Sequence, residues 1–497
     1  MQARRVPGVS ITPDPRRVLF RPFFPGGPSR ARTIIARVMT LTEEEVKAEL
    51  NWVMEEFGDR HRNLLRFFAR RYSEVGHLRL TDAPLSRERE LLIGAYFTNE
   101  YSLEAAALFN PSMIWHPDQS GLKPGAKRFI LSLRATGEGH ISSLQFRSGV
   151  ISSAGGEGGG RRGRSPRIEL DPVTAYVTTP ERTLDRSFQR SLFGKKLLEL
   201  GVKYEFVRAV MGRLAEHFTF SELRDVVEEA RRTEPLPPRV AQEAADAVVG
   251  LAESNYEIRF DADLPLCERI IFPSTPSEVK GIEDARFVEF TDDDGAVTYY
   301  ATYTAYDGRT AFPQLLETPD FLAFKSHTLN GPAVANKGLG LFPRKIGGRY
   351  ACVGRQDGEN IYLMFSDNPS FWYKKEILQR PTQPWEFVQL GNCGSPIETE
   401  AGWLVLSHGV GPMRKYCIGA FLLDKEDPMK VIGRLPEPLL TPAGNEREGY
   451  VPNVVYSCGG QIFDNELIIP YAMSDYASGF AAVALDDLLE TLERNPA

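Results

Sequence analysis

The chain has 497 residues, about three times the length of a typical single domain. Apolar residues make up 42% and charged residues 25%, which excludes a disordered chain and allows a sizeable core. A net charge of -7 argues against bulk nucleic-acid binding, although it leaves room for a local basic site that holds an anion. The 43 glycines and 35 prolines exceed ordinary usage and indicate many turns.

The N-terminal segment and the cysteines indicate in which cellular compartment the protein is expected. The segment MQARRVPGVSITPDPRRVLF has early arginines but no apolar stretch behind them, and no run of about 18 apolar residues occurs. We therefore expect neither a secretory signal nor a membrane span. The 5 cysteines are widely spaced and form no CxxC, so we expect reduced, buried thiols in a cytoplasmic protein rather than disulfides or a metal cluster.

The first part of the chain is expected to be helical. Thr42 and Glu45 have the spacing of a capping box, in which each side chain bonds the backbone of the other residue. Apolar residues then recur at helical intervals, at Val46, Leu50, Val53 and Phe57. Further helices are predicted over residues 63–72 and 88–97. We expect residues 1–105 to form a helical arm without catalytic residues, through which the chain could form a homo-oligomer.

From about residue 106 the pattern changes to short β-rich segments separated by turn residues. One unit recurs, a short strand, a polar turn and a second strand rich in aromatic or branched residues, as in RFVEF-TDDDGAV-TYYATYTAY and GSPIETE-AG-WLVLSHGV. The second strands centre near residues 131, 301, 351, 404 and 468, and the last four are about 50 to 64 residues apart. This period predicts a mainly β protein with a five-bladed β-propeller over residues 106–497, with a β-sandwich of similar hairpins as the alternative.

A helical insertion is expected at about residues 155–255, between the first two repeats. It begins with GGEGGGRRGRSPR at 155–167, a flexible basic loop whose arginines could bind phosphate or nucleic acid, although such runs are more often solvated. Thr219 and Glu222 again have capping-box spacing, and residues 187–250 are predicted to be helical.

Polar residues stand at the ends of the predicted strands in every repeat. In a propeller these ends converge, so the residues are expected to lie together in space. They are Asn110, Ser112 and Arg134 in the first repeat, Asp284, Asp307 and Arg309 in the second, Lys337, Arg355 and Asn360 in the third, His408 and Tyr416 in the fourth, and Asp475 in the fifth.

The residue types in this set suit a reaction on a sugar with an anionic co-substrate. A carboxylate can give a proton to a leaving oxygen, and a guanidinium matches phosphate with two parallel hydrogen bonds. Many carboxylates with few histidines do not suit a transition-metal site, and no GxSxG, P-loop or HExxH motif occurs. We therefore expect no metal and no organic cofactor. Trp372 and Trp403 are expected in the core rather than as platforms for a sugar.

Several of these residues also have a structural interpretation. Asp284 could cap a turn or pair with Arg286. His408 could be a satisfied histidine at a strand end, and Arg309 and Lys337 could be ordinary surface charges.

The motifs resemble glycoside hydrolase family 130, the β-mannoside phosphorylases and related β-mannosidases. They are GIEDARF with TYTAYDG, NKGLGLFPRKIGG, GWLVLSHGV followed by YCIGAFLLDKEDPMKVIGR, and VPNVVYSCG with YAMSD. They follow the family's order and cover residues 109–492 apart from the insertion, while the arm and the insertion look like additions of a longer subgroup. The family motif commonly reads GIEDPR, and Ala285 replaces the proline, so this loop is expected to be slightly less rigid with the acid retained.

The resemblance implies a five-bladed propeller and an inverting reaction in which Asp284 is the general acid. Inorganic phosphate would be the co-substrate and nucleophile, a mannose hydroxyl would relay the proton, and α-mannose 1-phosphate would be the product. The phosphate-binding residues by position are Arg309, Lys337, His408 and Arg355. The sugar-binding residues are Asn110, Ser112, Arg134, Asp307 and Asp475, to which we add Asn360 and Tyr416. The expected ligands are phosphate and a small carbohydrate, a β-1,2-linked manno-oligosaccharide or mannosyl sugar, with no nucleic acid or membrane partner.

Two other functions remain open. An inverting hydrolase needs a second carboxylate that activates water, about 6.5–9.5 Å from the acid, and Glu359 or Glu448 could supply it. A phosphorylase needs cations instead, and the presence of Arg309, Lys337 and His408 favours phosphorolysis. A non-catalytic carbohydrate-binding propeller is the third alternative.

Overall fold

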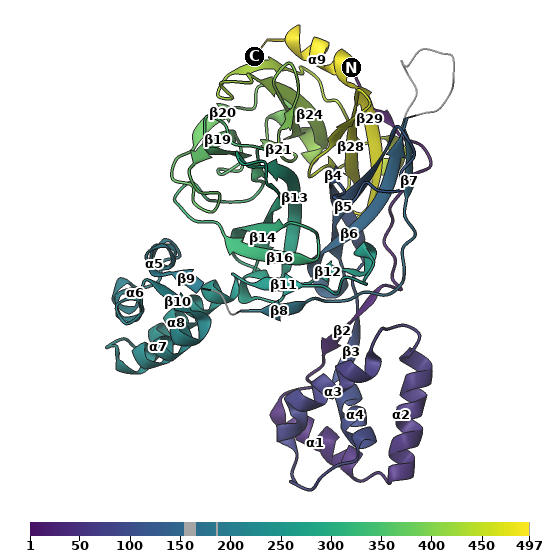
Figure 1. The fold of residues 1–497 in the computed structure, drawn as a ribbon, viewed down its shortest axis with the longest axis vertical. Coiled ribbons are helices and arrows are strands. Elements are labelled where there is room, and N and C mark those ends of the chain that lie inside the picture. The colour runs from purple at the N-terminus through teal and green to yellow at the C-terminus, as the bar shows by residue number, and fades with distance from the viewer. Residues whose placement is uncertain (154–165, 185–186, 497) are drawn as a thin grey trace.

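A computed structural model describes residues 1–153, 166–184 and 187–496, and this part of the chain is mainly β with helices in two groups (Figure 1). The basic loop at 155–167 lies outside the described residues except for its last two positions. All five second strands expected from the repeat pattern are present. They are β5 (Ala126–Thr136), β14 (Val297–Tyr306), β18 (Tyr350–Gly354), β23 (Trp403–Val410) and β28 (Glu466–Met473).

Each of these strands is the second strand of an antiparallel meander. The first meander adds β4 (Ala107–Trp115), β6 (Ser142–Ser152) and β7 (Arg167–Leu170), and the second adds β13 (Gly281–Thr291), β15 (Ala311–Thr318) and β16 (Ala323–Thr328). The third adds β17 (Gly340–Leu341), β19 (Ile361–Ser366) and β20 (Glu376–Gln379). The fourth adds β21 (Gln389–Asn392), β22 (Ile397–Glu398), β24 (Tyr416–Leu423) and β25 (Val431–Arg434). The fifth adds β26 (Val455–Tyr456), β27 (Gln461–Phe463), β29 (Ala477–Ala484) and β1 (Arg4–Arg5).

The first two meanders form one sheet because Gly281 of β13 pairs in parallel with Ser142 of β6. The far edge of this sheet is extended by β11 (Glu257–Arg259) and β8 (Glu181–Thr183), and β12 (Ile270–Ile271) pairs with β6. The other three meanders are separate sheets.

Apolar side chains connect each meander to the next. Phe342 and Val353 pack with Trp403 between the third and fourth meanders, and Leu131 packs with Phe480 between the first and the fifth. The hydrophobic core is therefore a series of layers between consecutive meanders. Trp403 and Trp372 are fully buried, which confirms their predicted place in the core, and the five cysteines are buried, as expected.

The N-terminal residues differ from the expected helical arm. Arg4 and Arg5 form β1, which pairs with Ala482 and Ala481 of β29, and Ile11 bridges to Ser478. Local helix signals could not predict this pairing, because its partners lie at the other end of the chain. The first residues therefore complete the fifth meander.

The helices form two groups. The first contains α1 (Pro28–Met39), α2 (Glu43–Phe57), α3 (Leu64–Val75) and α4 (Arg87–Tyr96), and it is connected to the sheets through the pair β2 (Val18–Pro22) and β3 (Thr98–Ser102) (Figure 1). The second contains α5 (Arg190–Glu199), α6 (Tyr204–Met211), α7 (Phe220–Thr233) and α8 (Pro238–Glu253), next to the short pair β9 (Ser187–Gln189) and β10 (His217–Thr219). A last helix, α9 (Leu485–Glu493), packs on the fourth and fifth meanders.

Both predicted capping boxes are present, at Thr42 with Glu45 and at Thr219 with Glu222. The second helical group is fixed to the sheets where Lys196 Nζ donates to the carbonyl oxygen of Leu329 at 2.9 Å. Among the described residues, no helix is long and apolar enough to cross a membrane.

Candidate functional site

Two matching irregularities bring Asn110 and Asp284 together. The pairing of β4 shifts between Phe109 and Ser112, and the pairing of β13 shifts between Glu283 and Arg286, as in a β-bulge. Inside these bulges Asn110 and Asp284 have φ of 51° and 53°, a left-handed conformation that costs energy in residues other than glycine. The amide nitrogen of Asn110 donates to Asp284 Oδ1 at 2.7 Å. The bulges therefore aim two buried polar side chains at each other.

Arg134, at the end of β5, fixes the same carboxylate. Its Nη1 lies 3.3 Å from Asp284 Oδ1, its Nη2 lies 2.8 Å from Glu283 Oε1, and its Nε donates to Ser142 Oγ at 2.8 Å. Lys337 Nζ lies 3.4 Å from the other oxygen of Glu283. Of the structural alternatives for Asp284, a pair with Arg286 does not form, since the carboxylate contacts Arg134 instead.

The charges around Asp284 control its ionisation. Burial alone would raise the pKa of this carboxyl. The positive charges of Arg134, Lys337 and Arg286 and the hydrogen bond from Asn110 outweigh burial and lower the pKa well below its usual range. Asp284 is therefore an ionised carboxylate in the ligand-free protein.

Asp475, in the loop between β28 and β29, has the opposite shift. Burial and then the negative charge of Asp284 raise the pKa of Asp475 to about 6. Arg134 and Lys337 oppose this rise. The two carboxyls therefore differ in protonation at slightly acidic pH, a pattern found where acids and bases are divided in an active site.

A second cluster contains Arg286, Arg355, His408 and Tyr456, all buried. Arg286 Nη2 donates to Tyr456 Oη at 2.7 Å, and Arg355 Nη1 lies 3.2 Å from His408 Nε2. A Cβ at Gly338 would lie 2.9 Å from Arg355 Nε and 3.2 Å from Arg286 Nη1, so both guanidiniums reach the same glycine. We call these four residues the cationic cluster.

The two arginines of the cationic cluster have no direct carboxylate contact in the described part of the chain. Neither Arg286 nor Arg355 forms an ion pair with a carboxylate there, and the Nε of each has no hydrogen-bond partner. Burial and then the charges of Arg355 and Arg286 lower the pKa of His408 well below its ordinary value, so the imidazole is neutral. Buried unpaired guanidiniums with free donors are suited to an anion.

Other predicted residues have local roles. Ser112 Oγ accepts from Phe287 N at 3.0 Å and so connects β4 to β13. Tyr416 stacks on His408 with ring centroids 6.1 Å apart. Asn360 Nδ2 donates to Asp357 Oδ2 at 2.6 Å within its own loop.

Asp307 and Arg309 lie apart from the buried clusters. Asp307 Oδ1 accepts from the backbone nitrogens of Arg309 and Thr310 at 2.7 and 2.6 Å, so it caps the loop between β14 and β15. Arg309 is exposed, and its side chain makes no hydrogen bond or ion pair with another described residue. The structure thus brings together most of the predicted site but leaves Asp307, Arg309 and Asn360 outside the contacts that hold it.

No phosphate-binding role was predicted from the sequence for two residues of the cationic cluster. Arg286 stands in the GIEDARF motif, two positions after Asp284, and this proximity was the available signal. Tyr456 stands in the VPNVVYSCG motif, but only its hydroxyl contact with Arg286 reveals its place in the cluster.

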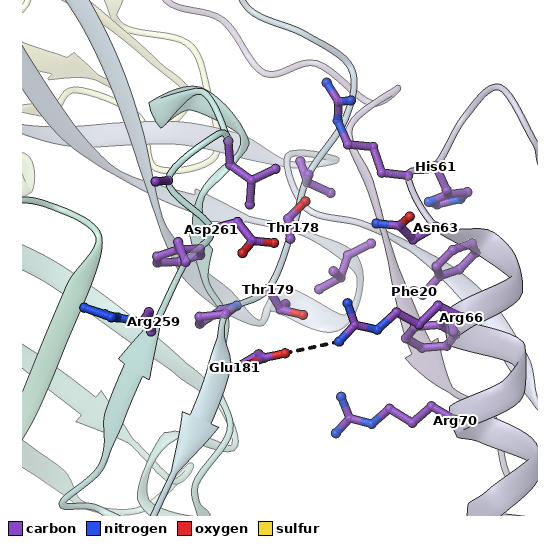
Figure 2. A pocket seen from close by; sticks show the side chains of 18 of the residues that line it. Phe20, His61, Asn63, Arg66, Arg70, Thr178, Thr179, Glu181, Arg259 and Asp261 are labelled. Atoms are coloured by element: carbon purple, nitrogen blue, oxygen red, sulfur yellow. Dashed lines mark hydrogen bonds and ion pairs between the residues drawn. The ribbon is translucent and has the colours of Figure 1, made fainter.

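A separate cavity of about 530 Å³ lies between α3 and the strands β8 and β11 (Figure 2). Arg66 of α3 forms an ion pair with Glu181 of β8 at 3.2 Å across it, and Arg70 extends from the same helix. Both partners of this pair are largely exposed, and no predicted site residue lines the cavity. This cavity therefore lies at the junction between the first helical group and the sheets, away from the candidate site.

Comparison with known proteins defines the class, an enzyme of the glycoside phosphorylase type. The profile of glycoside hydrolase family 130, described as beta-1,4-mannooligosaccharide phosphorylase, matches residues 239–494. The chain belongs to this family. Asp284 and the cationic cluster lie inside the match, whereas Asn110 and Arg134 lie outside it and join the site through the fold.

Two curated relatives are similar over about half of this chain. The 1,2-beta-oligomannan phosphorylase of Thermoanaerobacter sp. (strain X514) is 36% identical over 247 residues, 48% of this chain and 79% of that protein. The beta-1,2-mannobiose phosphorylase of the same organism is 33% identical over 242 residues, 47% of this chain and 76% of that protein. Among solved structures, beta-1,2-mannobiose phosphorylase from Listeria innocua has a TM-score of 0.46 and 19% identity, covering 79% of this chain and 93% of that chain.

Proposed function

We propose that the protein cleaves β-mannosides with inorganic phosphate and inverts the anomeric centre, giving α-mannose 1-phosphate. The observation that supports this proposal most directly is the pair of buried guanidiniums, Arg286 and Arg355. Among the described residues neither has a carboxylate partner, the Nε of each is a free donor, and both lie beside the Asn110–Asp284 contact. The named activities of the two curated relatives favour a β-1,2-linked manno-oligosaccharide or mannosyl sugar as substrate. Phosphate is the co-substrate, and the proposal needs no metal or organic cofactor.

The proposed architecture is a five-bladed propeller over residues 106–497 that β1 completes, with a helical arm within residues 1–105 and a helical insertion at about 155–255. Five meanders in chain order support it, together with apolar layers that connect each meander to the next and the fifth to the first. The β1–β29 pair adds support, because it ties the N-terminus to the fifth meander. Most of the site residues then lie on first strands, near the ends of second strands or on the loops between second and third strands.

In the proposed reaction, a phosphate oxygen attacks C1 of the mannosyl unit while the bond from C1 to the leaving oxygen breaks. Arg286 and Arg355 hold the phosphate, neutral His408 donates a hydrogen bond to it, and Lys337 and Arg309 add positive charge. The proton on the leaving oxygen comes from Asp284 through a mannose hydroxyl. Because Asp284 is ionised without ligand, bound phosphate must first offset its cationic neighbours so that the carboxyl can take up a proton.

Phosphorolysis is favoured over hydrolysis by the position of the other carboxylates. Glu359 and Glu448, the candidates for a water-activating base, are exposed, whereas Asp284 is buried. A hydrolytic base would need to lie close to the acid on the opposite face of the sugar. The five buried, unpaired thiols fit the proposed cytoplasmic location, where thiols stay reduced.

The direct test supplies purified protein with α-mannose 1-phosphate and a sugar acceptor and measures inorganic phosphate. We expect phosphate release in the wild type and none in Asp284→Asn. Cleavage of β-mannosides in phosphate-free buffer without any phosphate effect would establish the hydrolase instead. Unchanged behaviour of Asp284→Asn in every assay would support a non-catalytic carbohydrate-binding protein.

A further inference from the structure

An exposed aromatic pair is connected to the candidate site. The rings of His140 and Tyr450 have centroids 5.3 Å apart at an angle of 32°. Tyr450 is 54% exposed, and His140 is exposed on the loop between β5 and β6. Rings of this kind present an apolar face with a polar edge to the solvent. We call these two residues the aromatic pair.

Backbone contacts connect Tyr450 to the candidate site. The nitrogen of Val451, the next residue, donates to the carbonyl oxygen of Ser474 at 3.1 Å. Ser474 directly precedes Asp475, and its Oγ donates to the carbonyl oxygen of Glu446 at 2.6 Å. The segment that carries Tyr450 therefore runs alongside the loop that carries Asp475.

His140 is connected to the other side of the site. It lies two residues before Ser142, whose Oγ accepts from Arg134 Nε at 2.8 Å. Arg134 in turn contacts Asp284 at 3.3 Å. The contacts of Ser142 and Arg134 therefore connect His140 to Asp284, and the contact of Val451 with Ser474 connects Tyr450 to the loop of Asp475.

The loop of His140 is strained and has a counterpart in another meander. Gly139 and His140 have φ of 67° and 59°, and in the loop between β23 and β24 Met413 and Arg414 have φ of 58° and 55°. Each loop is closed by the same contact, from the backbone nitrogen of a glycine to the carbonyl oxygen four residues on, Gly137 to Ile141 and Gly411 to Lys415.

Strain of this type persists where the surroundings impose it and is concentrated at functional sites. Burial of these side chains does not offset the strain, since Met413 is 92% exposed and His140 is exposed. Tyr101 Oη instead donates to the carbonyl oxygens of Glu138 and Ile141 at 2.8 and 3.2 Å and so holds the His140 loop in place. The fold therefore holds the ring of His140 beside Tyr450 in a strained backbone conformation, and burial of the His140 side chain does not offset this strain.

We propose that the aromatic pair is a platform for a distal sugar of the acceptor, one pyranose or more beyond the bond that is cleaved. This inference rests on the proposed function and specifies its substrate length. The bond that reacts lies near Asp284, which is 8% exposed, whereas Tyr450 is more than half exposed, so the pair contacts only an acceptor that extends outward. The occupant is a neutral β-linked manno-oligosaccharide whose apolar ring face packs on Tyr450, and the enzyme therefore prefers oligosaccharide acceptors to free mannose.

The experiment measures phosphate release from α-mannose 1-phosphate with mannose, β-1,2-mannobiose or β-1,2-mannotriose as the acceptor. In Tyr450→Ala we expect KM for the mannotriose to rise about tenfold, with unchanged KM for α-mannose 1-phosphate and unchanged kcat with mannose. Tyr450→Phe should keep the wild-type preference, and His140→Ala should weaken it. Tyr373→Ala is the matched control, since Tyr373 is 58% exposed and contacts Phe371 with centroids 4.4 Å apart, in a different meander.

A Tyr450→Ala enzyme whose preference among the three acceptors equals that of the wild type would overturn the platform, as would an equal loss with mannose. A wild type that releases no phosphate with any acceptor would instead overturn the proposed function. Calorimetric titration of mannotriose into wild type and Tyr450→Ala then decides the platform on its own, because equal affinities refute it and a weaker variant supports it.

Discussion

The side-chain amide of Asn110 donates a 2.7 Å hydrogen bond to the carboxylate of Asp284 across 174 positions of sequence. Both residues are buried and both have left-handed backbones inside matching bulges. The contact spans the first two meanders, and only Asp284 lies in the part of the chain that matches the family profile. The acid of the proposed reaction is therefore positioned by a residue from outside that match.

Asn110→Ala should remove this positioning. Loss of a buried hydrogen bond to a carboxylate should destabilise the protein by about 1–3 kcal/mol and raise the pKa of Asp284 toward its ordinary value. We expect kcat/KM for phosphorolysis to fall about 10- to 100-fold, measured with the phosphate assay, and urea unfolding to report the stability change. A variant with wild-type kcat/KM would show that the contact has no part in the reaction.

Arg286→Lys should weaken phosphate binding. Lysine keeps the charge but loses the fork of donors, including the Nη2 that contacts Tyr456. We expect KM for phosphate to rise about tenfold or more while KM for the mannoside changes little. Arg344→Lys is the control, since Arg344 pairs with Glu398 at 2.8 Å and is 40% exposed. Equal effects of the two substitutions would remove Arg286 from the phosphate site.

Asp475 should make folding stability depend on pH. Its pKa is raised to about 6 in the folded protein, so the folded state holds a proton that the unfolded chain releases at lower pH. This contribution is fully present below about pH 4 and is lost as the pH rises through 6, and it amounts to about 2–3 kcal/mol. Asp475→Asn should flatten the dependence between these values, measured by urea unfolding from pH 4 to 7.5. If the unfolding free energy of the wild type and of Asp475→Asn changed equally with pH, the raised pKa of Asp475 would be contradicted.

Glu104→Gln should destabilise the junction of the N-terminal segment with the first meander. Glu104 is fully buried, with Arg17 Nε and Arg147 Nη2 both 2.7 Å from its Oε1. Removing its charge leaves two buried guanidiniums without a counter-ion, which should cost about 3–5 kcal/mol of unfolding free energy. Glu398→Gln, at the partly exposed pair with Arg344, should cost at most about 1 kcal/mol. Similar decreases in unfolding free energy for Glu104→Gln and Glu398→Gln, measured by urea unfolding, would contradict this prediction.

Local patterns in the sequence determined much of this fold. Capping-box spacing located the starts of α2 and α7, and the recurring strand–turn–strand unit located β5, β14, β18, β23 and β28, because these features depend on residues that are close together in the chain. The motif around Asp284 indicated an acid next to a group of cations. Buried thiols and core tryptophans followed from composition and spacing alone.

Only the tertiary structure decided which of these residues meet. Asp284 contacts Arg134 rather than Arg286, Tyr456 joins the cationic cluster, and Arg309 stays exposed. The pairing of β1 with β29 was likewise invisible to local signals. The physical reason is that these contacts join positions far apart in the chain, and their geometry depends on bulges and on how the meanders pack. The sequence determined which chemical groups were available, and the packing of the meanders decided which of them act together.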